Sequence, residues 1–334
     1  MMLQRTLGPF SVSAIGLGCM NLSHAYGTPP DEATSIRLLN EALDMGYNML
    51  DTAALYGFGA NESLLGKAVM HRRDEFVLAS KCGMFKNAQG VREIDGHPAT
   101  IRKTCEDSLQ RLGTEVIDLY YLHRWDRRVP IEESIGALAE LVAEGKIRSI
   151  GLSEVSATTL RKAHAVHPIT ALQTEYSLWT RNPELGVLET CNELGVAFVA
   201  FSPLGRGALT GKLRDVSLFE EKDIRKNMPR FYADNFARNL LLVDQLQMLA
   251  ESQGCTAAQL SLAWLLARDE NIIPIPGTTS LQHMQENIAA MAYKPDAQIM
   301  QQLEELINQK TVIGTRYNAA TQAEIDTEEF NDMA

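Results

Sequence analysis

The chain has 334 residues, of which 45% are hydrophobic and 22% charged, a balance typical of a globular protein with one barrel-sized domain or two ordinary ones. Its formal net charge of -11 argues against a nucleic-acid partner, because a phosphate backbone needs a basic surface. No apolar stretch is long enough to span a bilayer, so we expect no membrane association. The absence of a secretory signal and five widely spaced cysteines without a CxxC pair favour a cytoplasmic protein with reduced thiols and no structural metal.

Apolar strand-like runs alternate with helix-like segments along most of the chain. The helices are expected over residues 31–45, 100–112, 131–143, 183–194, 255–267 and 280–291, several of them with one apolar face. The strands are expected over residues 14–18, 47–51, 76–81, 116–123, 147–152, 170–175, 197–202 and 272–276. Eight strands that are each followed by a helix predict a (β/α)8 TIM barrel. The alternative is a doubly wound sheet, but no GxGxxG fingerprint opens a helix.

We therefore expect a single domain over residues 1–334, with the barrel at about residues 14–295 and a C-terminal helix and tail over residues 296–334. Turn chemistry near Gly8 and Pro9 predicts an N-terminal hairpin that covers the bottom of the barrel. Residues 203–235 form a long loop after the seventh strand, which is typical of a functional or mobile segment. The acidic segment 310–334 is expected to be an extended, partly disordered tail.

Four titratable residues lie at or just past the ends of three successive predicted strands: Asp51, Tyr56, Lys81 and His123. In a parallel barrel these ends open on one face, where active sites lie. Reduction of a carbonyl needs a proton for the oxygen, and the phenol of Tyr56 can supply it if a nearby ammonium lowers its pKa. Lys81 would be that ammonium, held by Asp51, while His123 would orient the carbonyl. Taken singly, each residue could equally cap a turn, line a pocket or be structural.

The order of several motifs resembles that of the aldo-keto reductases over nearly the whole length. The motifs lie at residues 46–57, 62–66, 118–123, 145–153, 201–205 and 275–287. Within this superfamily the chain looks most similar to the bacterial and plant branch of pyridoxal and perakine reductases. The resemblance implies NADP(H)-dependent reduction of aldehydes or ketones to alcohols, with Tyr56 as general acid, Lys81 and Asp51 as its tuning pair, and His123 for polarisation.

The resemblance also implies a cofactor site, with NADPH preferred and NADH possible. The loop before the last predicted helix would bind the adenosine 2′-phosphate at the helix start, although His283 and Thr279 stand where many relatives carry a stronger cation. The cofactor-binding residues implied are Gly18, Cys19, Met20, Asp51, Ser153, Glu154, Gln173, Phe201, Ser202, Pro203, Leu204, Gly205, Arg206, Gly207, Ile275, Pro276, Gly277, Thr278, Thr279, Ser280, His283, Glu286 and Asn287.

The substrate and the partners are less constrained by the sequence. Tyr26, Phe85, Trp125 and Tyr232 are expected to line the mouth of the barrel and to favour apolar aldehydes or ketones, unless they only pack against loops. We expect a monomer or a weak homo-oligomer. Two other classes stay open: a cofactor-binding regulatory barrel resembling potassium-channel β-subunits, with little turnover, and a metal-dependent hydrolase. The second needs several histidines at strand ends, whereas only His123 is predicted there.

Overall fold

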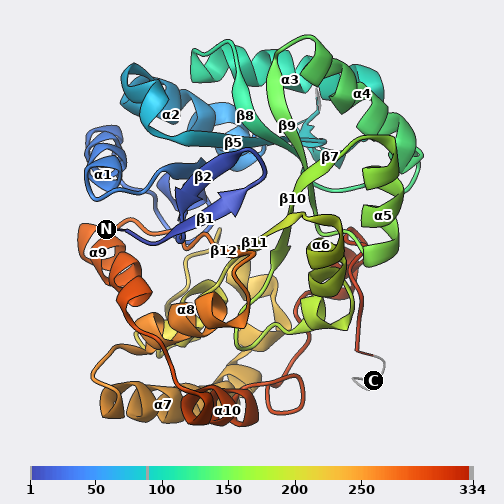
Figure 1. Ribbon diagram of the computed structural model, residues 1–334. Coiled ribbons are helices and arrows are strands. Elements are labelled where there is room, and N and C mark those ends of the chain that lie inside the picture. The colour runs from blue at the N-terminus through green and yellow to red at the C-terminus, as the bar shows by residue number, and fades with distance from the viewer. Residues whose placement is uncertain (1, 88–89, 331–334) are drawn as a thin grey trace.

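The structure is a computed structural model that describes residues 2–87 and 90–330. Eight parallel strands form its centre, and helices surround them in a ring (Figure 1). In their order around the sheet the strands are β12 (Ile272–Pro274), β11 (Ala197–Phe201), β10 (Ile169–Glu175), β9 (Ile147–Ser153), β8 (Ile117–Leu122), β5 (Val77–Cys82), β4 (Met49–Asp51) and β3 (Leu17–Gly18).

The first and last strands of this sheet meet, and their contact closes the barrel. The backbone N–H of Gly16 donates to the carbonyl of Pro274 at 3.0 Å, and that of Gly18 donates to the carbonyl of Pro276 at 3.3 Å. Gly18 also forms a parallel bridge with Gly277. The predicted (β/α)8 barrel is therefore confirmed.

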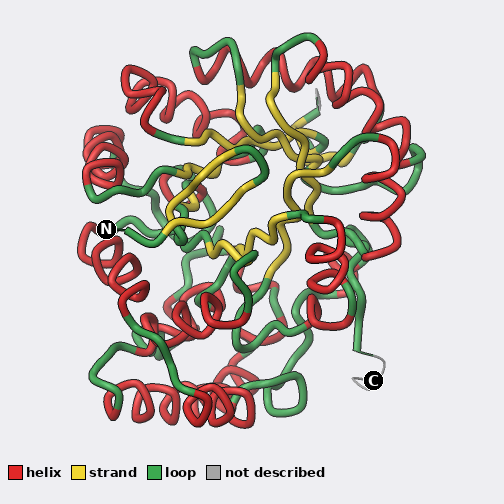
Figure 2. Tube along the Cα trace, in the orientation of Figure 1, coloured by secondary structure: helices red, strands yellow, loops and turns green. Residues whose placement is uncertain are grey.

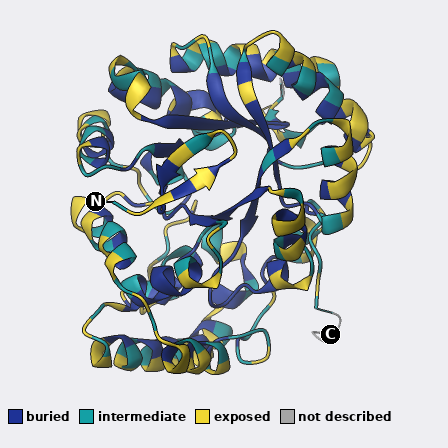
Figure 3. Cartoon of the chain, in the orientation of Figure 1, coloured by how far each residue is buried: buried dark blue, intermediate teal, exposed yellow. Residues whose placement is uncertain are grey.

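Two hydrophobic clusters fill the molecule. The larger one lies between the strands and the helices, and the smaller one fills the inside of the barrel with residues such as Met49, Leu119 and Val199. The N-terminal hairpin of β1 (Gln4–Leu7) and β2 (Phe10–Ser13) adds Leu7 and Val12 to the inner cluster. Figure 3 shows the buried strands inside helices whose outer faces are exposed. The hairpin thus covers one end of the barrel, as predicted.

The helices around the barrel follow the predicted alternation (Figure 2). They are α1 (Glu32–Asp44), α2 (Ala60–Val69), α3 (Pro98–Leu112), α4 (Ile131–Ala143), α5 (Ala157–Val166), α6 (Val187–Leu194), α8 (Ala257–Arg268) and α9 (Leu281–Ala289). Local chemistry fixes several ends: Asp31 caps α1 through its bond from the Thr34 N–H, and Gly113 ends α3 in the left-handed conformation. No helix in the described part of the chain is long and apolar enough to cross a bilayer.

Several elements lie outside the predicted ranges: the barrel helices α2 and α5, a further helix α7, and a small hairpin. Helix α7 (Ala233–Ser252) follows the long loop and packs against α10 (Ala297–Leu306). Its apolar residues are spread around the helix, with Leu241 and Met248 exposed, so no single apolar face indicates a helix. A small hairpin of β6 (Met84–Lys86) and β7 (Arg92–Ile94) extends the loop after β5.

The long loop and the tail both pack over the open end of the barrel. The loop contains four short 3-10 helices, η5 (Gly205–Thr210), η6 (Val216–Leu218), η7 (Ile224–Asn227) and η8 (Pro229–Phe231), and ring contacts join Phe231 to Phe219 and Phe236. The tail is extended except for α11 (Ala319–Gln322) and is hydrogen-bonded to the barrel, for example from the Asp326 N–H to the Glu154 carbonyl at 3.0 Å. The tail is thus extended, as predicted, and residues 310–330 are ordered against the barrel; the last four residues of the predicted tail lie outside the described part.

Candidate active site

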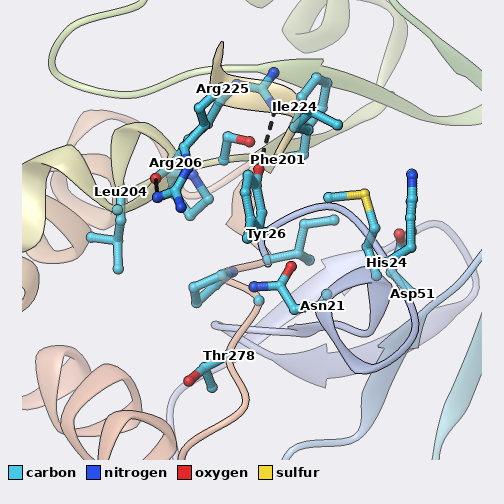
Figure 4. A pocket seen from close by; sticks show the side chains of 18 of the residues that line it. Asn21, His24, Tyr26, Asp51, Phe201, Leu204, Arg206, Ile224, Arg225 and Thr278 are labelled. Atoms are coloured by element: carbon cyan, nitrogen blue, oxygen red, sulfur yellow. Dashed lines mark hydrogen bonds between the residues drawn. The ribbon is translucent and has the colours of Figure 1, made fainter. Parts of the chain in front are cut away.

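A cavity of about 580 Å³ opens at the carboxyl ends of the strands. Figure 4 shows Asp51 and His24 toward one end of it and Leu204 toward the other. Most of the predicted site residues line it: Gly18, Met20, Tyr26, Asp51, Tyr56, His123, Ser153, Gln173, Phe201, Ser202, Pro203, Leu204, Arg206, Gly207, Ile275, Pro276, Gly277, Thr278, Thr279, His283, Glu286 and Asn287. Segments far apart in the sequence therefore meet in one cavity, as strand ends in a parallel barrel should.

The predicted catalytic residues are in mutual contact. The fully buried ammonium of Lys81 forms an ion pair with Asp51, donates to the carbonyl of Thr52 at 2.8 Å and lies 3.2 Å from the hydroxyl of Tyr56. The second carboxylate oxygen of Asp51 accepts a hydrogen bond from Gln173 at 2.7 Å. Strands β4, β5 and β10 thus fix Lys81 beneath the phenol from several sides.

The turn after β4 brings Tyr56 back over the barrel. Gly57 and Phe58 follow it with positive φ angles of 57° and 52°, and such a conformation in a bulky residue such as Phe58 is uncommon outside strained or functional turns. The Tyr56 ring meets the His123 ring edge-on, with 5.8 Å between centroids. The phenol and the imidazole therefore meet at the cavity wall, and the ammonium of Lys81 lies 3.2 Å from the phenol hydroxyl.

Burial and neighbouring charges compete in this cluster, and burial sets the direction of the pKa at Tyr56 and His123 but not at Lys81. Burial raises the pKa of Tyr56 above its ordinary value of 10.0, although the Lys81 charge opposes that shift. This corrects the expectation of a lowered pKa, and it leaves the phenol protonated at neutral pH. Burial lowers the pKa of Lys81, but the charges of Asp51 and Tyr56 outweigh it and raise that pKa overall. Burial, reinforced by the Arg124 charge, lowers the pKa of His123 well below 6.5, so its imidazole is neutral.

The far end of the cavity has the features of an anion site. Ser280 caps α9 by accepting from the His283 N–H at 3.4 Å, and the Ser280 N–H donates to the Thr278 hydroxyl at 3.1 Å. From the long loop, the Lys212 ammonium lies 3.0 Å from a ring nitrogen of His283 and 3.5 Å from the Glu286 carboxylate. A helix start and a cation suit a phosphate group.

Comparison with known proteins places the chain in a family. Residues 14–308 match the aldo/keto reductase family. The chain belongs to that family. Similar solved structures include a glycerol dehydrogenase from Gluconobacter oxydans, with 27% identity, a TM-score of 0.85 and 95% of this chain and 98% of that chain covered. An aldo-keto reductase from Bacillus halodurans in its holo form has 30% identity, a TM-score of 0.78 and coverage of 92% and 97%.

A third solved structure, an aldo-keto reductase from Klebsiella pneumoniae in complex with NADPH, has 28% identity, a TM-score of 0.73 and coverage of 95% and 99%. Family membership makes the present chain an oxidoreductase. Its finer assignment to the pyridoxal and perakine reductase branch stays a prediction.

The residues of this aldo-keto reductase fit a nicotinamide dinucleotide. One continuous cavity is lined both by Tyr56 and by Thr278, which belongs to the candidate phosphate site at the start of α9. Between them lie the exposed face of the aromatic Phe201 and the backbone of Gly207, where an added Cβ would meet nothing closer than 3.6 Å. The Nδ1 atom of His123 is buried and has no hydrogen-bond partner within the described chain, which leaves a polar atom for a ligand in the cavity to satisfy.

Some predicted residues of this reductase lie outside the cavity wall: Cys19, Lys81, Phe85, Trp125, Glu154, Gly205, Tyr232 and Ser280. The Glu154 carboxylate is buried and receives two hydrogen bonds from Arg316 of the tail, one of them at 2.8 Å, so it does not face a nicotinamide. The Trp125 indole N–H donates to Val129 within its own loop at 2.8 Å. Tyr232 is 47% exposed at the start of α7. Of the four predicted substrate residues, the structure brings only Tyr26 to the cavity.

Sequence reasoning missed other residues that line the cavity, among them His24, Arg124, Lys212, Arg225 and Tyr317. Arg124 follows His123 directly, so the rule of strand ends could have included it. No motif or spacing indicates the others, because they come from the long loop, the β3 loop and the tail. Within the described chain, no group of three histidine, cysteine, aspartate or glutamate side chains is placed to share a metal ion.

Proposed function

We propose that this aldo-keto reductase reduces aldehydes or ketones to alcohols with NADPH, and that Tyr56 is the general acid. The observation that supports it is the buried ammonium of Lys81, which lies 3.2 Å from the Tyr56 hydroxyl, while Tyr56 lines a cavity of about 580 Å³. A lysine is rarely buried without a functional or pairing reason, and here its ion pair with Asp51 holds it charged beside the phenol.

A bound nicotinamide cofactor would supply the hydride for the carbonyl carbon. Tyr56 donates its proton to the carbonyl oxygen, so the C=O double bond becomes a C–O single bond with new C–H and O–H bonds. The Lys81 ammonium stabilises the tyrosinate that remains until solvent reprotonates it. His123, neutral because of its lowered pKa, donates a hydrogen bond that orients the carbonyl without competing as an acid.

Tyr56→Phe tests the assignment of the acid. The variant keeps the ring that packs against His123 but has no proton to give, so we expect kcat to fall by about a hundredfold or more. Tryptophan fluorescence titration should show the NADPH affinity changed by less than about twofold, because the hydroxyl faces the carbonyl rather than the dinucleotide. A variant that keeps most of the wild-type kcat would refute the acid role. If neither protein turns over any member of a broad aldehyde panel while both bind NADPH, the alternative of a cofactor-binding regulatory barrel takes precedence.

For the cofactor, we propose that Lys212 supplies the cation for the 2′-phosphate that Thr279 does not. Lys212→Met should raise the Kd for NADPH by roughly tenfold, the effect of losing one charge-assisted contact, and should leave the Kd for NADH almost unchanged. Lys222→Met is the matched control, because Lys222 is exposed on the same loop and does not line the cavity. Equal effects on the two cofactors would place the 2′-phosphate away from Lys212.

A further inference from the structure

The positive charges of the cavity are balanced with one exception. Three of the four arginine and lysine side chains that line it have a carboxylate within ion-pair distance: Arg206 with Glu175 at 2.7 Å, Arg225 with Asp223 at 2.6 Å and Lys212 with Glu286 at 3.5 Å. The fourth is Arg124. Within residues 2–87 and 90–330 it forms no ion pair with a carboxylate, although the chain as a whole carries an excess of acidic groups.

Neutral acceptors hold the Arg124 side chain in place. One of its terminal nitrogens, Nη1, donates to the carbonyl of His123 at 2.7 Å and to the hydroxyl of Ser153 at 3.0 Å. These bonds fix the guanidinium on the loop after β8 and against the end of β9, and they leave its charge uncompensated. The Arg124 charge reinforces burial in lowering the pKa of His123, and it opposes the effect of burial in raising the pKa of Tyr56.

The position of Arg124 separates it from the candidate phosphate site. It is the direct neighbour of His123, whose ring faces Tyr56, whereas Lys212 and Thr278 lie with α9 on the other side of the barrel mouth. Leu55 and Met84 add apolar wall to the same cavity. A group bound at Arg124 is therefore beside the reacting carbonyl.

We propose that Arg124 is the anion-recognition residue of the substrate site, and that the preferred substrates are carbonyl compounds that carry a carboxylate or phosphate group on an apolar body. A ligand that fills the cavity would shield the Arg124 charge from water, and a charge that is buried in this way is normally paired. The planar guanidinium presents donors that match the two oxygens of a carboxylate or a phosphate. In a chain of net charge -11, such a local cation favours the approach and binding of an anionic substrate. The inference rests on the proposed reductase function and adds the chemical class of its substrate.

Pairs of aldehydes that differ only in charge test this inference. The first pair is 4-carboxybenzaldehyde and its methyl ester, and the second is glyceraldehyde 3-phosphate and glyceraldehyde. The wild-type enzyme should show a kcat/KM roughly tenfold or more higher for the anionic member of at least one pair, as expected for one charge-assisted contact. The pair that shows the preference identifies the anion as carboxylate or phosphate. No preference in either pair overturns the inference.

Arg124→Met should reduce that ratio to about one, and Arg124→Lys should restore part of it. Arg128→Met is the matched control, because it removes the same charge from the same loop, lies outside the cavity wall and should keep the wild-type ratio. If Arg124→Met lowers kcat/KM equally for both members and weakens NADPH binding as well, Arg124 serves the cofactor and the inference is wrong. If the wild-type enzyme also fails to reduce the neutral aldehydes, the proposed function itself has failed, which is a different result from a lost preference.

Discussion

Gly18 sits where the barrel closes and where the cofactor loop begins. A Cβ built on it would lie 2.9 Å from the Ile275 carbonyl oxygen and 3.5 Å from the backbone nitrogen of Gly277. Any side chain there would push β3 away from the segment that follows β12. The missing side chain thus serves both the closure of the sheet and the position of the loop that lines the cavity.

Gly18→Ala should therefore lower the free energy of unfolding by about 1–3 kcal/mol, because the close contact is with backbone that cannot rotate away. Urea unfolding followed by circular dichroism measures this loss. Gly136→Ala is the control: Gly136 lies inside α4 with nothing within 4 Å of the built Cβ, so alanine should be neutral or stabilise by up to ~1 kcal/mol. Equal stability of the two variants would mean that β3 can move away from the segment after β12 without loss of unfolding free energy.

At the scale of elements, the tail is part of the site. Arg316 is buried and binds the carboxylates of Glu154 at 2.8 Å and Glu175 at 3.0 Å, at the ends of β9 and β10. Glu175 also accepts from Arg206 of η5 at 2.7 Å, and Arg206 in turn donates to the Tyr317 hydroxyl at 3.0 Å. The tail, the long loop and two strand ends are thereby joined through buried ion pairs beside the cavity.

Arg316→Met would leave two buried carboxylates with too few cations. We expect a loss of about 3–5 kcal/mol in unfolding free energy, the usual effect of removing one partner of a buried ion pair, and weaker NADPH binding because η5 loses its support. Arg127→Met is the control: Arg127 pairs with Asp326 of the same tail at 3.5 Å but is 48% exposed, so its removal should cost less than about 1 kcal/mol. Urea unfolding measures the stability of both variants, and fluorescence titration measures their affinity for NADPH. Small and equal losses in both variants would mean that the tail does not support the cavity.

Across the whole molecule, backbone strain gathers on one face. Within the described chain, the non-glycine residues with positive φ lie in loops after barrel strands: Ala25, Phe58, Arg127, Glu154, Ser202 and Arg206. Strained conformations persist only where the surrounding structure enforces them, and they cluster at functional sites. The end of the barrel that the hairpin covers carries none of these residues. This agrees with the usual division of the fold, in which one end serves stability and the end with the strand carboxyl termini holds the active site.

Acid should destabilise the molecule through two groups, His123 and Glu175. Burial holds the pKa of His123 well below 6.5, so the unfolded chain binds more protons and stability falls as pH drops below about 6.5. Burial raises the pKa of Glu175, but Arg206 and Arg316 outweigh it and hold that pKa at about 2. Its contribution is therefore complete above the unfolded value of 4.5 and is lost as pH falls toward 2.

His123→Gln should make the unfolding free energy less sensitive to pH between about 6.5 and 5, since the glutamine does not titrate. Glu175→Gln should lower stability at neutral pH and flatten the curve below about pH 4.5. Urea unfolding at a series of pH values measures both slopes. A His123→Gln slope that matches the wild type above pH 5 would show that other groups, such as His24 with its own lowered pKa, account for the acid sensitivity.

The sequence by itself determined the barrel and the predicted cluster of titratable residues at its mouth. Alternating apolar runs and helix caps are local signals, and parallel strands that share one open face bring Asp51, Lys81 and His123 together wherever the loops go. This is why the predicted tetrad meets in the structure although its members are up to 72 positions apart in the printed numbering, from 51 to 123.

Only the tertiary structure decided which residues complete the site. Glu154 turns to Arg316 rather than into the cavity, Trp125 bonds within its own loop, and Lys212 reaches His283. Each of these contacts depends on loop and tail conformations that join distant parts of the chain, and no local period or cap encodes them. The tertiary structure also decided that the pKa of Tyr56 is raised, because burial outweighs the opposing charge of Lys81. Desolvation depends on everything that packs around a group, and not on its neighbours in the sequence.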